Sequence, residues 1–201
     1  MTSPAPATDG RSARSQRTRE AVVDALLALI REGDLRPTAR QIAERATISL
    51  RSVYVHFDDL EDLFFAAAQR QMAIVATMIT PIASDLPLPE RIDRVCNLRG
   101  RIFEEVGPIW RAAQVQAPFS PTLSGLVARV RTNSREGLAE LFSTELATLP
   151  PTARARHLGA LDAALSRETW DLLRSSHSMS FAEARKTMVE SATALLSGAA
   201  R

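Results

Sequence analysis

The chain is poor in the residues that disulfide-bonded, β-rich or membrane-spanning proteins need. Cys96 is the only cysteine among 201 residues, so no intramolecular disulfide can form. Glycine and proline are few, and no run of alternating β-branched residues stands out, which favours helices over strands. No uninterrupted apolar run approaches about 18 residues, and the opening segment lacks a secretion signal. These absences predict a cytoplasmic, all-α protein that does not enter a membrane.

Positive charge is concentrated near the N-terminus. Residues 1–57 carry nine arginines and six acidic residues, a net charge of +3, whereas residues 58–201 carry sixteen basic and seventeen acidic residues, a net charge of −1. This asymmetry is typical of a protein that binds phosphates at one end. The arginines before the first predicted helix and in its first turn are Arg11, Arg14, Arg17 and Arg19.

Apolar spacing and turn residues predict about nine helices. Residues 1–14, rich in Ser, Pro, Ala and Thr, are expected to be a disordered arm, followed by a helix-turn-helix domain at 15–60 and a further helical domain at 61–201. The first helix, 15–32, is expected to end at Gly33. After the helix-turn-helix, the expected helices are 61–80, 89–106, 108–116, 121–149, 152–175 and 180–198.

Residues 38–57 predict two short helices joined by a tight turn. Thr38 with Gln41 has the pattern of a capping box, and Ser49 can cap the second of the two helices. Asp58 with Glu61 is expected to cap the helix that follows. The expected inner face consists of Ile42, Ala43, Ala46, Val53, Tyr54 and Phe57, and the turn of Thr47, Ile48 and Ser49.

This pair of helices has the composition of a DNA-reading motif. Arg51 can contact guanine O6 and N7 in two places at once, and Leu50 can meet a thymine methyl. Taken alone, Tyr54 is better explained as a half-buried core aromatic and His56 as a surface histidine; their combination on one helix favours DNA. The predicted DNA-binding residues are Thr38, Arg40, Ser49, Leu50, Arg51, Ser52, Tyr54 and His56.

Residues 17–64 resemble the N-terminal domain of TetR-type transcriptional repressors. The length and the helical remainder also match, so the resemblance extends over the whole chain, although it is specific only in the first third. It implies a homodimer that binds a DNA operator and responds to a small-molecule effector, with residues 61–201 as the ligand-binding and dimerisation domain. The matching residues are Thr38, Ile42-Ala43, Ala46, Ile48-Ser49, Ser52-Val53-Tyr54, His56-Phe57 and Glu61-Asp62-Leu63.

Two positions depart from the family pattern. Thr47 replaces the usual turn glycine, which implies a different turn or backbone strain at a positive φ. Leu60 replaces the lysine that contacts a DNA phosphate in the family, so that contact is expected to be missing; Arg40 or the upstream arginines are candidates to compensate. By family analogy the arm could also track the minor groove, although a solvated tail is the simpler interpretation.

Polar residues inside apolar helical stripes are candidates for an effector pocket, because burying a polar group is costly unless it finds a partner. For each residue alone a structural role is the simpler explanation: Arg99 can pair with an acid or reach solvent, and Gln71 and Asn133 can satisfy each other. If Arg99 is buried without a protein partner, an anionic ligand becomes the hypothesis. The candidates are Gln71, Arg99, Phe103, Trp110, Gln114, Asn133 and Ser134.

The last two helices are expected to form the homodimer interface as a four-helix bundle; the alternative is that they close the monomer core. The apolar positions are Phe181, Ala184, Met188, Ala192, Leu195 and Leu196 on one helix and Leu158, Leu161, Leu165, Trp170, Leu172 and Leu173 on the other.

Two other classes of function are alternatives to a DNA-binding regulator. An enzyme is disfavoured because the three histidines stand apart, and because no nucleophile motif, glycine-rich phosphate loop or Cys/His cluster is present, so no cofactor or metal is expected. The other alternative is a helical protein-interaction module whose DNA binding serves only autoregulation. The most consistent prediction is a ligand-responsive, dimeric repressor that binds a pseudo-palindromic operator.

Overall fold

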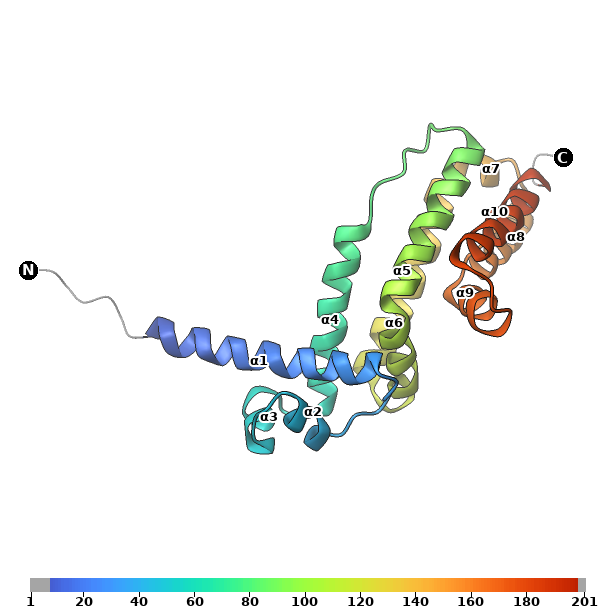
Figure 1. Ribbon diagram of the computed structural model, residues 1–201. Coiled ribbons are helices and arrows are strands. Elements are labelled where there is room, and N and C mark those ends of the chain that lie inside the picture. Colours follow the sequence, from blue (N-terminus) through green and yellow to red (C-terminus); the bar gives the residue numbers. More distant parts are fainter. Residues whose placement is uncertain (1–7, 199–201) are drawn as a thin grey trace, which may run out of the picture. The chain divides into compact units, whose positions relative to one another are not determined.

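The computed structural model describes residues 8–198, and the all-α prediction is confirmed. The described residues form ten α-helices, one short 3-10 helix and one π-helical turn, without a strand (Figure 1). No described helix is long and apolar enough to cross a bilayer. The elements are α1 Thr8–Arg31, α2 Ala39–Arg45, α3 Leu50–His56, α4 Leu60–Met78, α5 Leu88–Gln116, η1 Ala117–Phe119, α6 Pro121–Leu141, α7 Ser143–Ala147, α8 Pro151–Ala164, α9 Arg167–Asp171, η2 Leu172–Ser176 and α10 Phe181–Gly198.

The chain divides into two compact units. The first unit comprises the chain up to Ile74 together with Gly107–Val127, and the second unit comprises Val75–Val106 together with the chain from Ala128. Helices α4, α5 and α6 therefore each contribute residues to both units. The sequence predicted a functional boundary between residues 60 and 61. The two units are defined by packing and not by function, so this boundary stays a prediction.

The first unit is built around the apolar side of α1. Leu26 and Ile30 of α1 share one buried cluster with Ile42 of α2, Phe57 of α3 and Leu63 of α4. Figure 1 shows the short α2 and α3 lying together beside α1. The spacing of the α1 residues is that of an amphipathic helix, so the core follows directly from the sequence pattern.

Helix α1 begins at Thr8, seven residues before the expected start at Ser15. The second half of the segment that we expected to be a disordered arm is therefore helical, while residues 1–7 lie outside the described residues. The sequence 8–14 contains no proline, and α1 can extend through it at little cost once its later turns are packed. The helix ends where expected, at Gly33, whose φ of 103° suits a helix terminus.

Helix α5 continues through Pro108, where a break between 106 and 108 was expected. A proline inside a helix removes one hydrogen bond and costs about 3 kcal/mol. Beyond it, Ile109 and Ala112 are buried in the core of the first unit. Their burial holds the last turns of α5 in place, so tertiary packing overrides the local break.

Two expected long helices are interrupted. The expected helix 121–149 divides into α6 and α7 at Phe142, and the expected helix 152–175 divides into α8, α9 and η2. Phe142 and Leu165 are fully buried at these interruptions. Ser166 then caps α9 by accepting a hydrogen bond from the Thr169 amide at 3.1 Å. The breaks let apolar side chains turn inward, which periodicity alone does not reveal.

The N-terminus of α4 is capped by Asp59, not by the expected pair of Asp58 and Glu61. The Asp62 amide donates to Asp59 Oδ1 at 2.8 Å. Glu61 instead accepts a hydrogen bond from the Ser120 hydroxyl at 2.6 Å. A carboxylate one residue later satisfies the same orphan amides, so the sequence located the helix start to within a residue but not its cap.

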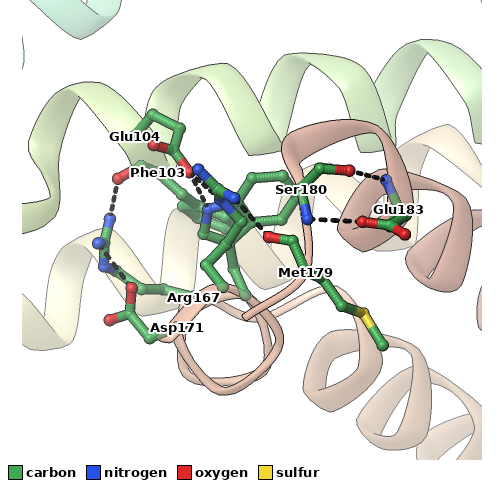
Figure 2. A network of polar contacts seen from close by, with 9 residues as sticks. Phe103, Glu104, Arg167, Asp171, Met179, Ser180 and Glu183 are labelled. Carbon is green, nitrogen blue, oxygen red and sulfur yellow. Dashed lines mark hydrogen bonds and ion pairs between the residues drawn. The ribbon is translucent and has the colours of Figure 1, made fainter. Parts of the chain in front are cut away.

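The core of the second unit closes on Trp170. Its ring packs edge-on against Phe181, with a centroid distance of 5.2 Å, and its indole N–H donates to Glu104 Oε1 at 2.9 Å. Arg174 donates to the same oxygen at 2.7 Å. Figure 2 shows this network, in which Arg167 also donates to the carbonyl of Phe103.

The apolar residues expected at a dimer interface lie instead in the core of this unit. Ala184, Met188, Ala192 and Leu196 of α10 are buried together with Leu161. Among the expected set only Leu172 is strongly exposed. The alternative interpretation is thus correct for these side chains, because α8 and α10 lie side by side and bury their apolar sides against their own chain (Figure 1).

Gly100 provides a test of the Trp170 packing. A Cβ atom at this position would lie 2.8 Å from Trp170 Cη2, so we expect Gly100→Ala to lower the free energy of unfolding by about 1–3 kcal/mol. Urea unfolding at neutral pH measures the change. Gly137→Ala is the matched control, because its Cβ would meet nothing within 4 Å and should stabilise the helix. Equal effects of the two substitutions would contradict this packing.

Glu104 predicts a pH dependence. The hydrogen bond from Arg174, assisted by the Trp170 indole, holds the pKa of Glu104 below its ordinary value of 4.5. The carboxylate therefore stabilises the fold above that value, and the stabilisation disappears as the pH falls through the lower pKa of the folded state. We expect Glu104→Gln to lower the urea midpoint more at pH 7 than at pH 3. Glu140→Gln, on an exposed part of α6, is the control and should show no such difference.

Candidate nucleic-acid interface

Helix α2 is held at its N-terminus by the capping box expected from the sequence. Thr38 Oγ1 accepts from the Gln41 amide at 3.3 Å, and the Thr38 amide donates to Gln41 Oε1 at 2.8 Å. Ile42 and Ala43 are buried against α1 and α3. The small Ala43 leaves space for a close crossing of α2 and α3, which fixes the angle between them.

The turn between α2 and α3 places Thr47 at φ 56°. The Thr47 amide donates to the carbonyl of Glu44 at 3.2 Å, and the Ile48 amide donates to that of Ala43 at 3.0 Å. This is the paired hydrogen-bond pattern that ends many helices at a left-handed residue, normally glycine. Thr47 is β-branched, so the turn keeps the geometry of the family at the cost of backbone strain.

Ser49 precedes helix α3 and caps its N-terminus, as expected. The Ser52 amide donates to Ser49 Oγ at 3.1 Å, and the two hydroxyl groups lie 2.8 Å apart. Val53 and Phe57 are buried and attach the helix to the core. Tyr54, which we expected on this inner face, is 50% exposed, so that part of the core prediction is wrong.

One side of α3 faces solvent. Leu50 is 45% exposed and Val55 is 70% exposed, and Arg51 and Tyr54 lie on the same side. The positions 50, 51, 54 and 55 form a single stripe at 3.6 residues per turn. Val55 was not among the predicted DNA-binding residues, although the helical period that exposes Leu50 and Arg51 also exposes it.

Arg51 is available for an external partner. Within the described part of the chain it makes no hydrogen bond or ion pair. Other arginines of the first unit are neutralised: Arg45 by Glu32 and Arg70 by Asp24. The solvent-facing stripe of α3 therefore contains a guanidinium group that is not committed within the chain.

The remaining predicted DNA-binding residues border this stripe. Ser52 and His56 are half-buried on the side of α3. Thr38 is exposed and its side chain is occupied by the capping box. Arg40 is exposed and pairs with Glu44 at 2.9 Å across one helical turn, a contact that contributes little in water and is readily exchanged for a phosphate.

The upstream arginines do not form one group. Arg19 lies over the Phe57 ring, 4.6 Å from its centroid, and so contacts the end of α3. Arg14 and Arg17 are exposed. Arg17 precedes Leu26 by two and a half turns of α1 and therefore lies on the side opposite the core. The side chain of Arg11 lies outside the described residues, so Arg19 alone is placed at the motif.

Leu60, which stands where the family has a lysine, is the first residue of α4 and packs against the core of the first unit. An aliphatic side chain there offers no donor to a phosphate oxygen, and the loss of that DNA contact stays a prediction. Thr38, Arg40 and Arg51 are among the exposed polar residues of this motif.

The candidate effector residues are divided between the two units. Gln71 is buried in the first unit, where Trp110 and Gln114 are half-buried. In the second unit Phe103 packs near Trp170, and Asn133 is exposed. Also in the second unit, Arg99 and Ser134 lie in hydrogen-bond contact.

Arg99 is held by neutral oxygens. It donates to the carbonyl of Leu165 at 2.7 Å, and to the carbonyl and hydroxyl of Ser134, both at 2.8 Å. Burial lowers the pKa of Arg99 to about 10, so it remains charged at neutral pH. Because Arg99 has protein partners, the condition that would point to an anionic ligand is not met. Its contact with Leu165, the residue that follows α8, suits a cation at a helix C-terminus.

Comparison with known proteins gives matches at the level of structure. No family model and no curated protein matches the sequence. A TetR-family transcriptional regulator from Streptomyces coelicolor superposes with a TM-score of 0.70 at 25% identity, covering 92% of this chain and 82% of its own. A putative TetR-family regulator from Mesorhizobium loti gives a TM-score of 0.62 at 20% identity, covering 92% and 98%.

More distant matches agree. A transcriptional regulator from Rhodococcus sp. RHA1 has a TM-score of 0.68 at 16% identity, covering 92% and 96%. The multidrug binding protein EbrR, solved with imidazole, has a TM-score of 0.56 at 20% identity, covering 86% and 93%. The fold and these neighbours support a DNA-binding transcriptional regulator. The resemblance to the TetR type that the sequence indicated is confirmed.

The turn at Thr47 provides a test of the motif's geometry. Glycine adopts a positive φ without strain, so we expect Thr47→Gly to raise the free energy of unfolding by up to about 1 kcal/mol. Thr132→Gly, at an exposed position inside α6, is the control and should destabilise by about 0.5 kcal/mol. Thermal and urea unfolding measure both. If both substitutions destabilise alike, the turn is not strained.

Proposed function

We propose that the protein is a cytoplasmic, dimeric transcriptional repressor that binds a pseudo-palindromic operator through residues 38–57 and releases it on binding a small molecule. The observation that carries the proposal is the solvent-facing stripe of α3. Two capped helices and a packed inner face present it rigidly, and Arg51 on it has no partner within the described chain.

The chemistry of the stripe fits the major groove. An arginine in the first turn of a reading helix can donate two hydrogen bonds to guanine. Leu50 and Val55 offer apolar contacts to thymine methyl groups, and Tyr54 offers a hydroxyl to a phosphate. Thr38 and Arg40 would hold the backbone where α2 crosses it. Exposed apolar side chains beside an uncommitted arginine favour a specific partner over a solvated surface.

A two-fold dimer would place two reading helices about 34–36 Å apart, one turn of DNA. We infer that α8 and α10 still provide the interface, but through their outer sides. Ala160 and Ala163 of α8 and Ala182 and Ala194 of α10 are exposed there. Small side chains permit close approach of the four helices that a dimer would bring together.

Ligand control requires an effector that prefers the conformer unable to bind DNA. A coupling of about 1–3 kcal/mol is typical of such regulators. Only three residues separate the end of α3 from the start of α4, so movement of α4 would displace α3. The candidate effector residues Gln71, Arg99, Phe103, Trp110, Gln114, Asn133 and Ser134 remain a prediction. That a structural neighbour is a multidrug binding protein supports an effector in general, without indicating which one.

Selection of genomic DNA fragments on the purified protein tests the proposal. Wild type should enrich a pseudo-palindromic site. Arg51→Ala should weaken binding to that site by about 1–3 kcal/mol and relax the preference at one base pair. Arg40→Ala should weaken binding to all sequences alike and reduce the salt slope by about 0.9. Affinities are measured on the selected site and on a scrambled one across a salt series.

Arg94→Ala, on the exposed side of α5 and paired with Glu90, is the control and should leave DNA binding unchanged. If wild type and Arg51→Ala bind every fragment equally and weakly, α3 does not read sequence. Purification with an unrelated protein in that case would favour the interaction module.

A further inference from the structure

A cavity of about 310 Å³ opens within the first unit, away from the residues that the sequence analysis assigned to an effector. It is bounded by the segment before α2, the first turns of α4, and the connection between α5 and α6. Its volume is at the lower limit of small-molecule sites, which suits a single small metabolite.

Two opposite charges line this cavity without pairing. Arg36 and Glu61 both contribute to its wall, yet among the described residues no guanidinium nitrogen lies within 4.0 Å of the Glu61 carboxylate. The Arg36 guanidinium lies over the Phe119 ring, 5.1 Å from its centroid. Because the two charges do not form an ion pair with each other, both are available to a third group.

Each charge is oriented by a neighbour. Glu61 Oε1 accepts from the Ser120 hydroxyl at 2.6 Å, and the same hydroxyl accepts from the Leu123 amide at 3.0 Å. Ser120 is buried, so its position is determined by the N-terminus of α6. Arg36 is oriented by its stacking on Phe119. A charged side chain that is oriented in advance loses less conformational entropy when it binds a ligand.

The remainder of the wall is largely apolar, with Thr38, Gln116 and Ser120 as its neutral polar residues. Leu60 and Phe64 from α4 and Leu123 from α6 face the cavity between the two charges. Phe119 is 71% exposed, an unusual position for a phenylalanine with no apolar cover. The lining thus combines one cation, one anion and an apolar surface.

We propose that this cavity binds a zwitterionic, amino-acid-like molecule with an apolar side chain. Its carboxylate would pair with Arg36, its ammonium group with Glu61, and its side chain would cover Leu60, Phe64 and Phe119. A guanidinium group binds a carboxylate through two parallel hydrogen bonds, and a carboxylate accepts well from an ammonium group. A ligand with one charge alone would leave the other charge of the cavity desolvated and unpaired.

The cavity also adjoins the DNA-reading motif. Thr38 is part of its wall and caps α2. An occupant would therefore contact Thr38, the residue that caps α2. Binding of the occupant should change the affinity for DNA, and binding of DNA should change the affinity for the occupant by the same factor. This consequence rests on the proposed function, whereas the binding itself does not.

Calorimetric titration of the full chain, without DNA, tests the binding. The probes are L-leucine, L-methionine and L-phenylalanine, each compared with its N-acetyl derivative, which lacks the ammonium group, and its carboxamide, which lacks the carboxylate. We expect at least one amino acid to bind saturably at millimolar concentration or below, and both derivatives to bind at least tenfold more weakly. Amide NMR shifts should concentrate at residues 36–38, 60–64 and 116–123.

Two variants locate the site. Arg36→Ala and Glu61→Gln should each weaken binding at least tenfold; the second retains an acceptor for Ser120 and so preserves the local fold. Arg70→Ala and Glu140→Gln are matched controls away from the cavity and should bind as wild type does.

Failure of all three amino acids to bind overturns the inference, as does binding that survives loss of either charge or that shifts residues elsewhere. A failure here with specific DNA selection intact would leave the proposed function standing. Binding that is confirmed here but leaves DNA affinity unchanged would retain the site and remove its link to α2.

Discussion

The reading helix depends on a constraint of length. Helices α2 and α3 contain seven residues each, and isolated helices of that length are not stable in water. Their stability comes from the ends and from one face: side-chain caps at Thr38 and Ser49, and burial of Ile42 and Phe57 against α1 and α4. The exposed face is consequently free to contain residues that contribute nothing to the fold. That freedom is what allows Arg51 to be uncommitted.

A second constraint governs the other unit, whose helices are interrupted repeatedly. Each interruption leaves carbonyl groups without an intrahelical partner. Arginines from other elements donate to these carbonyl groups. Arg91 donates to the carbonyl of Leu141 and to the carboxylate of Glu145. Arg99 donates to the carbonyl of Leu165, and Arg154 to that of Leu146. A guanidinium group has five donors in a rigid plane and can bind a helix end and an acid together. This explains structurally how a chain with a single lysine uses its many arginines.

Much of the motif was predictable because its determinants are local. The capping box at Thr38, the cap at Ser49 and the helix end at Gly33 depend on residues within four positions of one another. Tyr54 was expected on the inner face, although the helical period that exposes Leu50 and Arg51 exposes it too. The effector candidates show a limit of local signals. Polarity within an apolar stripe indicated Arg99 and Ser134 as candidates, but could not tell whether they bind each other or a ligand.

By itself the sequence determined the fold class and the position of the two short helices, because periodicity, caps and turn residues act over a few positions. It also indicated an unusual turn at Thr47, and the tertiary structure decided that the turn keeps a positive φ. Where long-range packing competes with those local signals, only the tertiary structure decided the outcome. Burial of Ile109 carries α5 through Pro108, and burial of Phe142 and Leu165 breaks helices that the pattern would continue. The same competition directs the apolar sides of α8 and α10 into their own core, and brings Arg36 and Glu61, distant in sequence, to one cavity. Long-range burial outweighs a local preference of a few kcal/mol at most, and no short stretch of sequence records it.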